Sequence, residues 1–335
     1  MVTMSDVARL AGVSVMTVSN VLNDRPYVKT STRDRVLAAV AELGYEINLS
    51  ARHLRSGQTG TVGLIVPRFS HPYFAELADA LASELTARGR HLAVEQSEAS
   101  REHELAALSR ARLQRYDAVV LSVAGLEREE LATLAESPPV VLLGEREMPA
   151  RFDHLQLANI EGARLATTRL LDSGARRVAV VGGDLQRDDA TARLRTDGWI
   201  AAHEERGLPV DERLVLSDGR YSAEEAHDAV IAAHAAGLDP DGYFAITDDI
   251  ATGVLAALHR LGRAVPEEIG VVGYDNLVAS AWTVPALTTI DAGRAEVART
   301  IADLIERRIA DPSASPRHLV GQVRLIERDS VAPLP

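Results

Sequence analysis

The residue types that catalyse reactions or bind metals form no recognisable catalytic or metal-binding motif in this sequence. There is no cysteine, which excludes disulfides, thiolate metal sites and a cysteine nucleophile. The ten histidines are scattered rather than placed at the spacing of metal ligands. The motifs G-x-S-x-G, H-E-x-x-H, the P-loop and a G-x-G-x-x-G after a strand are all missing, and Gly182 and Gly183 fit an ordinary strand-to-loop turn. An enzyme on an α/β fold is therefore a weak hypothesis, and no cofactor or metal is expected.

Near the N-terminus, a short stretch of uncharged polar and apolar side chains could instead form a surface that contacts a partner. Residues 15–22 follow Ser14, a natural helix N-cap, and are predicted to form a short helix. One side of this helix would bury Val18, Val21 and Leu22 at helical spacing. The other side presents uncharged side chains, which are Val15, Met16, Thr17, Ser19 and Asn20.

A second short helix is predicted just before this one. Ser5 would cap it, and Gly12 would end it because glycine takes positive φ without steric cost. Its inward face would consist of Val7, Ala8, Leu10 and Ala11. Two helices joined by a glycine-containing turn are typical of a helix-turn-helix, which places its second helix in the DNA major groove. An ordinary pair of packed helices is the alternative.

A third helix should close this N-terminal region. It is expected from about Thr32 to Leu43, with caps offered by residues 30–32 and an end at Gly44. Its apolar stripe would be Val36, Leu37, Val40 and Leu43.

A polar segment follows at residues 45–60. It is too polar for the core, although Leu49, Ala51 and Leu54 could share one side of a short helix. Its last five residues have the composition of a flexible linker. We therefore expect a headpiece at residues 1–48, a hinge helix with linker at residues 49–60, and a separate body at residues 61–335.

The formal net charge of −12 is unevenly distributed. Residues 1–60 carry seven basic and five acidic side chains, whereas the rest carries 29 basic and 43 acidic ones. A mildly basic region joined to an acidic body suits contact with DNA at one end only. No apolar run resembles a signal peptide or approaches 18 residues, so we expect a cytoplasmic protein without a membrane partner.

From residue 61 onward, apolar strands alternate with helices. The expected strands are 61–67, 91–96, 117–122, 139–144, 177–183, 213–216, 242–247 and 269–275. The expected helices are 74–88, 101–114, 127–136, 160–173, 192–206, 222–236 and 249–261. This alternation predicts parallel sheets covered on both faces. The pattern starts again near residue 160, so the body should have two lobes, with a ligand at the carboxyl ends of the strands.

Several ordered motifs resemble one family over essentially the whole chain. They are DVARLAGVS, TVSNVLN, TRDRVLAAVAELGY (32–45), SARHLR (50–55), VGLIVPRFSHPYFAEL (62–77), RLRTDGW (193–199), ITDDIATG (246–253), VVGYDN (271–276) and PALTTID (285–291). The sequence resembles the LacI/GalR family of transcriptional regulators. The resemblance implies an all-α helix-turn-helix headpiece and an α/β bilobed, periplasmic-binding-protein-like (type I) effector domain with two parallel sheets. The lobes would comprise residues 61–159 with 291–318, and 160–290 with 319–335.

The resemblance also implies roles within the headpiece. Val15, Met16 and Asn20 fall on positions that read base edges, where valine and methionine can contact a thymine methyl and asparagine best fits adenine. Many relatives carry Arg or His at position 20, so an operator sequence cannot be transferred. Positions that hold phosphates are matched by Ser14, Thr17, Ser19, Asn23, Tyr27, Lys29 and Thr32. For Ser14 and Thr32, helix capping alone is the alternative.

In residues 50–55, the resemblance implies a hinge helix that contacts the minor groove. Leu54 would wedge between base pairs, Ala51 would allow close approach, and Arg52 lies in the same segment. Packing of Leu54 on the body is the alternative. Relatives often have proline where Ile47 stands, so the resemblance implies that the entry to this hinge is looser than theirs.

Effector contacts are implied in the same way. Arg195 and Asp275 match residues that grip ligand hydroxyls or carboxylates, and a fork donor beside a fixed acceptor suits the vicinal hydroxyls of a sugar. The other candidates are Tyr73, Phe74, Tyr221, Asp248 and Trp282. Helix N-capping is the alternative for both aspartates. Thr247, Ala158 and Gly144 depart from the family pattern, where Asn, Asp and an acidic residue are common.

The sequence therefore predicts a DNA-binding repressor that is controlled allosterically by a small ligand, which we expect to be a sugar. Its partners would be double-stranded pseudo-palindromic operator DNA and a second copy of the chain, because the C-terminal residues lack the leucine heptads of a tetramerising helix. A solute-binding protein that delivers a sugar to a transporter is the alternative, although it would have no use for residues 1–60.

Overall fold

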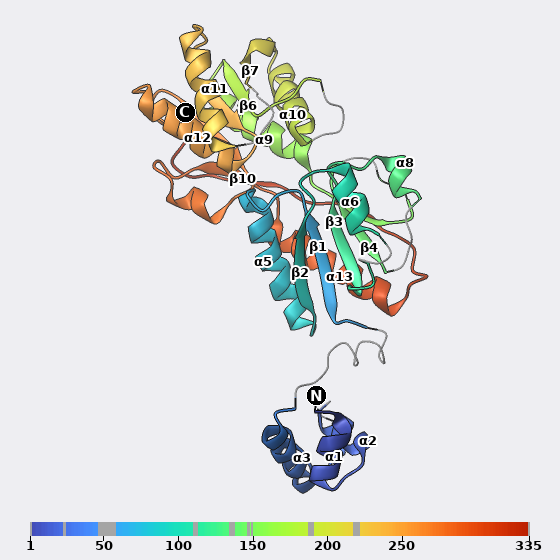
Figure 1. Ribbon diagram of the computed structural model, residues 1–335. Helices are drawn as coiled ribbons and strands as arrows, with labels where there is room; N and C mark the ends of the chain where they lie inside the picture. Colours follow the sequence, from blue (N-terminus) through green and yellow to red (C-terminus); the bar gives the residue numbers. More distant parts are fainter. Residues whose placement is uncertain are drawn as a thin grey trace. The chain divides into compact units, whose positions relative to one another are not determined.

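The computed structural model describes residues 2–22, 25–45, 58–109, 113–133, 138–145, 148, 150–186, 191–216 and 222–333. The chain divides into two compact units, Met1–Thr59 and Gly60–Pro335 (Figure 1). Within these described ranges, no helix is both long enough and apolar enough to cross a membrane.

The described residues of the N-terminal unit, 2–22, 25–45 and 58–59, include three helices that pack on one another. They are α1 (Met4–Ala11), α2 (Val15–Leu22) and α3 (Thr30–Leu43). Their shared core is small and consists of Val7, Ala8, Ala11, Val18, Val21, Val36 and Ala39. Gly12 at φ 62° and Gly44 at φ 58° end α1 and α3 in the left-handed conformation, which glycine adopts without steric cost.

The helix caps differ from those expected. Thr3, rather than Ser5, caps α1, because its hydroxyl accepts from the backbone N–H of Asp6 at 3.3 Å while the Asp6 carboxylate accepts from the Thr3 N–H at 3.0 Å. This reciprocal arrangement is a capping box. Helix α3 begins two residues early, at Thr30, with Lys29 at its N-cap and no side-chain cap. Thr32 therefore lies inside the first turn, and the capping alternative for it is wrong.

Three side chains of this unit lie on the opposite side from that expected. Leu10 and Leu37 are 46% and 48% exposed, whereas Ser19 is only 6% exposed. The reason is that each helix contacts the other two through one narrow stripe, so Ala39 takes the inward place expected for Leu37. The other face of α2 is correspondingly limited to residues 15–17 and Asn20.

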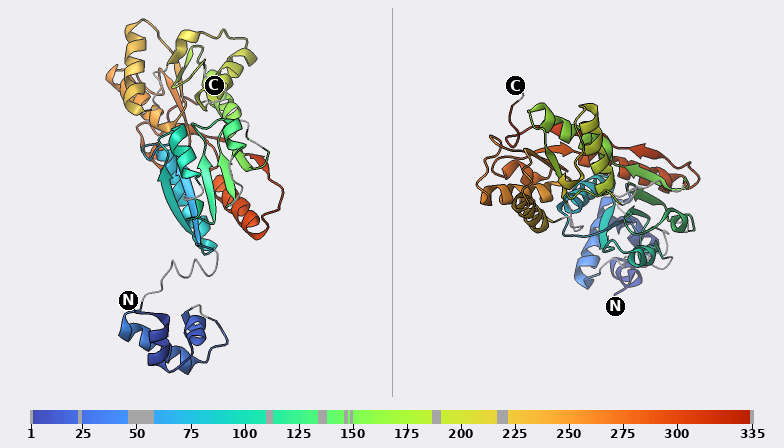
Figure 2. Two further views of the ribbon diagram at one scale, coloured as in Figure 1. Left: turned by 45° about the vertical axis from the view of Figure 1, so that its right-hand side comes forward. Right: turned by 90° about the horizontal axis from the view of Figure 1, so that it is seen from above.

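The first lobe of the C-terminal unit is built on a six-stranded sheet with the order β11-β5-β4-β3-β1-β2. Its strands are β1 (Thr61–Val66), β2 (His91–Gln96), β3 (Ala118–Ser122), β4 (Val140–Leu143), β5 (Asp153–Gln156) and β11 (His318–Val320). All neighbouring pairs are parallel. Figure 2 shows β11, in red, beside β5, in green, although 161 residues separate them in sequence.

Helices cover both faces of this sheet. They are α5 (Pro72–Ala87), α6 (Arg101–Ala107), α8 (Arg128–Leu131) and α13 (Arg294–Ala310). Alternate residues of β1 face opposite sides, so Leu64 packs with α5 and α13 while Ile65 packs in the cluster that contains Leu108 and Leu113. Helices α6 and α8 end earlier than the expected residues 114 and 136, and residues 110–112 and 134–137 lie outside the described ranges.

The second lobe has its own six-stranded sheet with the order β12-β10-β9-β8-β6-β7. Its strands are β6 (Val178–Val181), β7 (Val215–Leu216), β8 (Gly242–Ala245), β9 (Gly270–Tyr274), β10 (Thr288–Asp291) and β12 (Arg324–Ile326). Its helices are α9 (Asn159–Asp172), α10 (Thr191–Glu205), α11 (Ala223–Ala235) and α12 (Asp248–Arg260), with the 3-10 segments η1 (Glu212–Leu214) and η2 (Val278–Trp282). The strand expected at 213–216 is thus divided, with its first two residues in η1 and its last two in β7.

Two features of the sheets correct the prediction. Strand β12 pairs antiparallel with β10, so the second sheet is parallel except at that edge. The first sheet includes β11 up to Val320, beyond the expected lobe boundary at residue 318. The chain therefore crosses between the lobes after β5, between β10 and α13, and between β11 and β12.

Candidate functional site

Arg195 is held rigidly in the interior of the second lobe. Its side chain projects from α10 and the residue is 3% exposed. Its Nε donates to Oδ1 of Asn159 at 2.8 Å, and its Nη1 donates to the backbone carbonyl of Ile246. Its guanidinium carbon lies 3.5 Å from the ring centroid of Tyr274, a cation–π contact. Three independent contacts thus fix the orientation of this fork-shaped donor.

Asp275 lies next to this guanidinium, directly after β9. Its Oδ1 is 3.7 Å from Nη1 of Arg195, and the residue is 5% exposed. Its backbone has φ of 116°, a conformation that non-glycine residues rarely adopt and that is found preferentially at functional sites. Burial raises the pKa of Asp275 to about 8, against the opposing effect of the Arg195 charge. The structure therefore brings together the two residues expected to grip a ligand.

Three buried polar atoms near this pair have no hydrogen-bond partner within the described residues. They are Oη of Tyr73, Oε2 of Glu145 and Nδ2 of Asn159. Buried polar atoms in folded proteins are almost always paired, so three unpaired ones in one place are typical of a site that a ligand or water completes. We call these residues, with Arg195, Tyr274 and Asp275, the polar cluster.

The polar cluster draws on both lobes. Tyr73 lies in the first turn of α5 and Glu145 two residues after β4, in the first lobe. Asn159 begins α9, and Asp275 follows β9, in the second. Burial raises the pKa of the Tyr73 hydroxyl, and the charges of Asp275 and Glu145 add to this, so the three groups lie close enough to interact. The cluster therefore lies where the carboxyl ends of strands from both sheets meet.

Sequence reasoning missed Glu145. It noted that Gly144 lacks the acidic side chain that some relatives carry, but not that the next residue is a glutamate. Burial raises the pKa of Glu145 to about 7, and the charge of Arg195 opposes this rise. An acidic residue just after an apolar strand was the available signal.

Asp248 does not fit the ligand role expected for it. Its Oδ2 accepts from the Leu277 N–H at 2.8 Å and from the Ser280 hydroxyl at 2.5 Å, and its Oδ1 accepts from the Thr289 hydroxyl. Both carboxylate oxygens therefore hold the segment that follows β9. The N-capping alternative is also wrong, because Thr247 caps α12.

The remaining aromatic candidates form no described contact with Arg195 or lie outside the described ranges. Trp282 is 81% exposed on η2, so its expected effector contact is not supported. Phe74 packs edge-on against Tyr73, with ring centroids 5.3 Å apart, and contacts the core of the first lobe. Tyr221 lies outside the residues that the structure describes.

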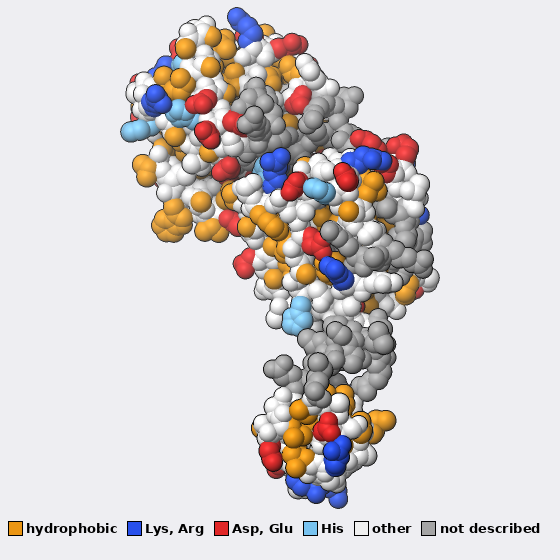
Figure 3. Space-filling model, in the orientation of Figure 1, with side chains coloured by type: hydrophobic (Ala, Val, Ile, Leu, Met, Phe, Trp, Pro, Cys, Tyr) orange, Lys and Arg blue, Asp and Glu red, His pale blue; other side chains and the backbone are white. Residues whose placement is uncertain are grey.

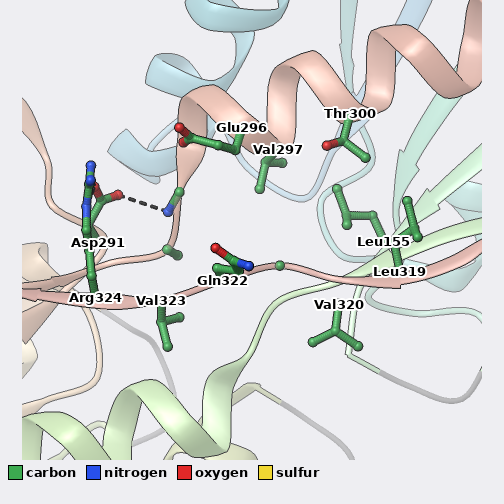
Figure 4. A pocket seen from close by; sticks show the side chains of 13 residues that line it. Leu155, Asp291, Glu296, Val297, Thr300, Leu319, Val320, Gln322, Val323 and Arg324 are labelled. Carbon is green, nitrogen blue, oxygen red and sulfur yellow. Dashed lines mark hydrogen bonds and ion pairs between the residues drawn. The ribbon is translucent and has the colours of Figure 1, made fainter.

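A separate cavity of about 370 Å³ lies where two of the crossovers between the lobes run side by side (Figure 4). Its lining residues are Leu155, Asp291–Gly293, Glu296, Val297, Thr300 and Leu319–Arg324. Asp291 accepts from the Gly293 N–H at 2.9 Å and pairs with Arg324 at 2.7 Å. This cavity contains none of the predicted effector residues.

On the N-terminal unit, α2 presents the predicted base-reading residues outward. Met16 is 70% exposed and Val15 44%, while Asn20 is partly buried. The hydroxyl of Tyr27 donates to Oδ1 of Asn20 at 3.5 Å. The face of this unit seen in Figure 3 carries hydrophobic side chains together with basic ones.

Ser14 caps α2, as expected. Its hydroxyl accepts from the Thr17 N–H at 3.1 Å and lies 2.9 Å from the Thr17 hydroxyl. Tyr27 is 71% exposed, and Lys29 is also exposed. The predicted DNA contacts Asn23, Ala51, Arg52 and Leu54 all lie outside the described residues.

Comparison with known proteins identifies the family. Residues 3–48 match the model of bacterial regulatory proteins of the lacI family, and residues 167–331 match a periplasmic binding protein-like domain. The chain is 31% identical over 333 residues to the HTH-type transcriptional repressor PurR of Pasteurella multocida (strain Pm70), which covers 99% of both proteins. The chain belongs to the lacI family of bacterial regulatory proteins.

Other relatives agree with this assignment. The ribose operon repressor of Escherichia coli (strain K12) is 31% identical and spans 98% of this chain and 100% of its own. A solved structure of the lac repressor dimer bound to operator and the anti-inducer ONPF is 25% identical, with a TM-score of 0.82 over 99% of each chain. This LacI-family protein is thus a DNA-binding transcriptional regulator, and the alternative of a solute-binding protein without a DNA role is not supported.

Proposed function

We propose that this LacI-family protein represses transcription from a pseudo-palindromic operator, and that a small sugar bound in the polar cluster alters its affinity for that operator. The observation that carries the effector part is the pairing of Arg195 with Asp275 among three unpartnered buried polar atoms. Such a protein acts on chromosomal DNA, so we infer that it works in the cytoplasm.

The chemistry of the polar cluster favours a polyhydroxy ligand. A guanidinium offers two parallel N–H donors, and a nearby carboxylate accepts two hydroxyl protons, so the pair can bind vicinal hydroxyls from both sides. Tyr73 and Asn159 add a hydroxyl and an amide N–H that lack partners. Tyr221, expected to stack on a sugar ring, remains part of the proposal on the ground of resemblance alone.

We propose that α2 reads the operator. Val15 and Met16 would contact thymine methyl groups, and Asn20 would bind an adenine edge. Phosphates would be held by the hydroxyls or charges of Ser14, Thr17, Tyr27, Lys29 and Thr32, with Asn23 as a further candidate. Burial of Ser19 makes it the weakest of the phosphate candidates.

The hinge contact is proposed from the sequence alone. Leu54 would insert between base pairs at the operator centre, with Ala51 and Arg52 in the minor groove. Insertion unstacks a base step at a cost of a few kcal/mol, which contacts made to the bent DNA would offset.

A homodimer is proposed because a dimer can present two headpieces to the two halves of a pseudo-palindrome. Three exposed apolar side chains support self-association of the second lobe. Val278 is 66% exposed, Trp282 81% and Val284 93%, and they lie close together in sequence on and just after η2. Apolar groups gathered in this way often mark an interface.

The test combines footprinting with ligand screening. Purified protein should protect a palindromic site upstream of its own or a neighbouring gene, and at least one sugar from a panel of sugars and nucleosides should raise its melting temperature and change that protection. Arg195→Ala should keep operator binding but lose the response to the sugar. Arg213→Ala, an exposed arginine on η1, is the matched control and should behave as wild type.

Two results would contradict the proposal. The repressor function fails if no site is protected with or without any member of the panel. The effector assignment fails if Arg195→Ala, still folded, binds and responds to the sugar as wild type does.

A further inference from the structure

Glu145 gives the polar cluster a second carboxyl group, and no described residue forms an ion pair with it. The residue lies two positions after β4, and its Oε2 is buried without a hydrogen-bond partner among the described residues. Asn159 and the Leu157 backbone, which lie near it, are neutral groups. Removing such a group from water is unfavourable unless a donor replaces the water.

Arg195, the cation that the described residues contribute to the cluster, cannot neutralise Glu145 fully, because other groups share its guanidinium. The Arg195 guanidinium already donates to Asn159 and to the Ile246 carbonyl, and lies 3.7 Å from Asp275. The next arginine that acts on Asp275 is Arg294, which pairs with Glu76 at 2.6 Å. The described charges of the cluster thus comprise two carboxyl groups and one guanidinium.

We propose that Glu145 is a specificity-determining residue that makes the cluster reject ligands carrying a phosphate or carboxylate and select neutral polyhydroxy ligands. A ligand anion would seek Arg195, which is the natural partner for phosphate and carboxylate. There it would meet Glu145 and Asp275, and wherever these two carboxyl groups are ionised, like charges side by side strongly disfavour its binding. A neutral ligand meets no such repulsion.

The unpartnered Oε2 of Glu145 also explains why the cluster would select neutral polyhydroxy ligands, in addition to rejecting anionic ones. A sugar hydroxyl donating to Oε2 of Glu145 would satisfy a buried acceptor and form a charge-assisted hydrogen bond, which is stronger than one between neutral groups. Burial raises the pKa of Glu145 to about 7 and that of Asp275 to about 8, so the two groups are fully ionised only above about pH 8, and the rejection of anions should strengthen as pH rises through this range. This inference rests on the proposed function, since it concerns the ligand of the same cluster.

The experiment compares neutral sugars with the same sugars carrying one anionic phosphate group. Full-length wild-type protein and Glu145→Gln are titrated by calorimetry at about pH 9, where both carboxyl groups of the cluster are ionised. The ligands are D-ribose and D-ribose 5-phosphate, D-glucose and D-glucose 6-phosphate, and inorganic phosphate. Glu145→Asp keeps the charge. Glu129→Gln removes one exposed negative charge from α8 of the same lobe and is the matched control.

We expect wild type, Glu145→Asp and Glu129→Gln to bind a neutral sugar at least about tenfold more tightly than its phosphate. In Glu145→Gln this ratio should fall by about tenfold or more, equivalent to about 1.4 kcal/mol, and inorganic phosphate should raise its melting temperature more than that of wild type.

Each other outcome overturns the inference. An unchanged ratio in folded Glu145→Gln, or an equal change in Glu129→Gln, removes the specificity role while the proposed sugar-binding function stands. Tight binding of a sugar phosphate by wild type contradicts it directly. If wild type binds neither the neutral sugars nor the phosphorylated ones, the proposed effector site itself fails, and this inference fails with it.

Discussion

Glu76 forms an ion pair with Arg294 at 2.6 Å, and this pair joins the two lobes next to the polar cluster. The second oxygen of Glu76, on α5, accepts from the Val278 N–H at 3.0 Å. Arg294, at the start of α13, donates to the carbonyl of Asp275 at 3.2 Å and to that of Asn276 at 3.4 Å. One ion pair of the first lobe therefore holds the backbone that carries Asp275 in the second.

The first prediction concerns this ion pair. Glu76→Gln should weaken communication between ligand and operator, because the segment after β9 loses a charged link to α5. Hydrogen bonds to charged groups contribute about 1.5–3 kcal/mol, so we expect a loss of about 1–3 kcal/mol in the free energy of unfolding. Sugar affinity should change less than the ratio of operator affinities with and without sugar.

Glu84→Gln on the same helix is the control, since its partners Arg88 and Arg299 lie away from the cluster. Calorimetry and operator titrations measure the two quantities. A Glu76→Gln variant with the wild-type operator response would mean that the ion pair only stabilises the fold.

The second prediction concerns the base-reading role of Asn20. Asn20→Ala should lower affinity for the wild-type operator by about 1–3 kcal/mol and relax the preference at one base-pair position, because the bidentate contact with adenine is lost. Tyr27→Phe, which removes the hydroxyl that donates to Asn20, should show a smaller effect in the same direction.

Lys29→Ala provides the comparison, as an exposed cation at the start of α3. It should weaken binding to all sequences alike and reduce the salt slope of log K by about 0.9. Operators with every base substituted at each position, titrated at several salt concentrations, separate the two behaviours. If Asn20→Ala lost the same operator affinity for every base variant of the operator, the base-reading role of Asn20 would be refuted.

The third prediction separates structure from ligand binding at Asp248. Asp248→Ala leaves three donors without their acceptor, the N–H of Leu277 and the hydroxyls of Ser280 and Thr289. Each buried unsatisfied group costs about 1–3 kcal/mol, so unfolding should become easier by about 2–5 kcal/mol. The chemical denaturation midpoint measures this. Loss of sugar affinity without loss of stability would instead restore the ligand role.

The fourth prediction concerns pH. The pKa of Asp275 is raised from 3.8 to about 8 in the folded protein, so folding retains a proton that the unfolded chain releases. The contribution to stability is present below pH 4 and is lost as pH rises through about 8. Glu145 and Asp248, with pKa values raised to about 7 and about 6, act in the same direction.

Asp275→Asn removes the Asp275 contribution and keeps a side chain that tolerates positive φ. The difference in unfolding free energy between wild type and this variant should therefore shift against wild type between about pH 4 and about pH 8, and should level off at higher pH. Denaturation at several pH values without sugar provides the test. A difference that is constant with pH would show that Asp275 is ionised throughout.

Local patterns in the sequence determined most elements of this fold. Gly12 and Gly44 end helices because few other residues adopt positive φ easily. Apolar runs such as residues 61–67 predicted buried parallel strands, and the spacing of apolar residues placed most helices within a few positions. Elements that depend on partners distant in sequence were not predicted, among them β5 and the antiparallel strand β12.

The sequence by itself also identified Arg195 and Asp275, since both lie in recognisable motifs. Only the tertiary structure showed that Glu145 lies beside them, that the oxygens of Asp248 are occupied, and that Trp282 is exposed. The physical reason is that side-chain type and spacing follow from neighbours along the chain. Which polar atoms remain without partners depends on groups that meet across two lobes, and that is decided when both sheets have formed.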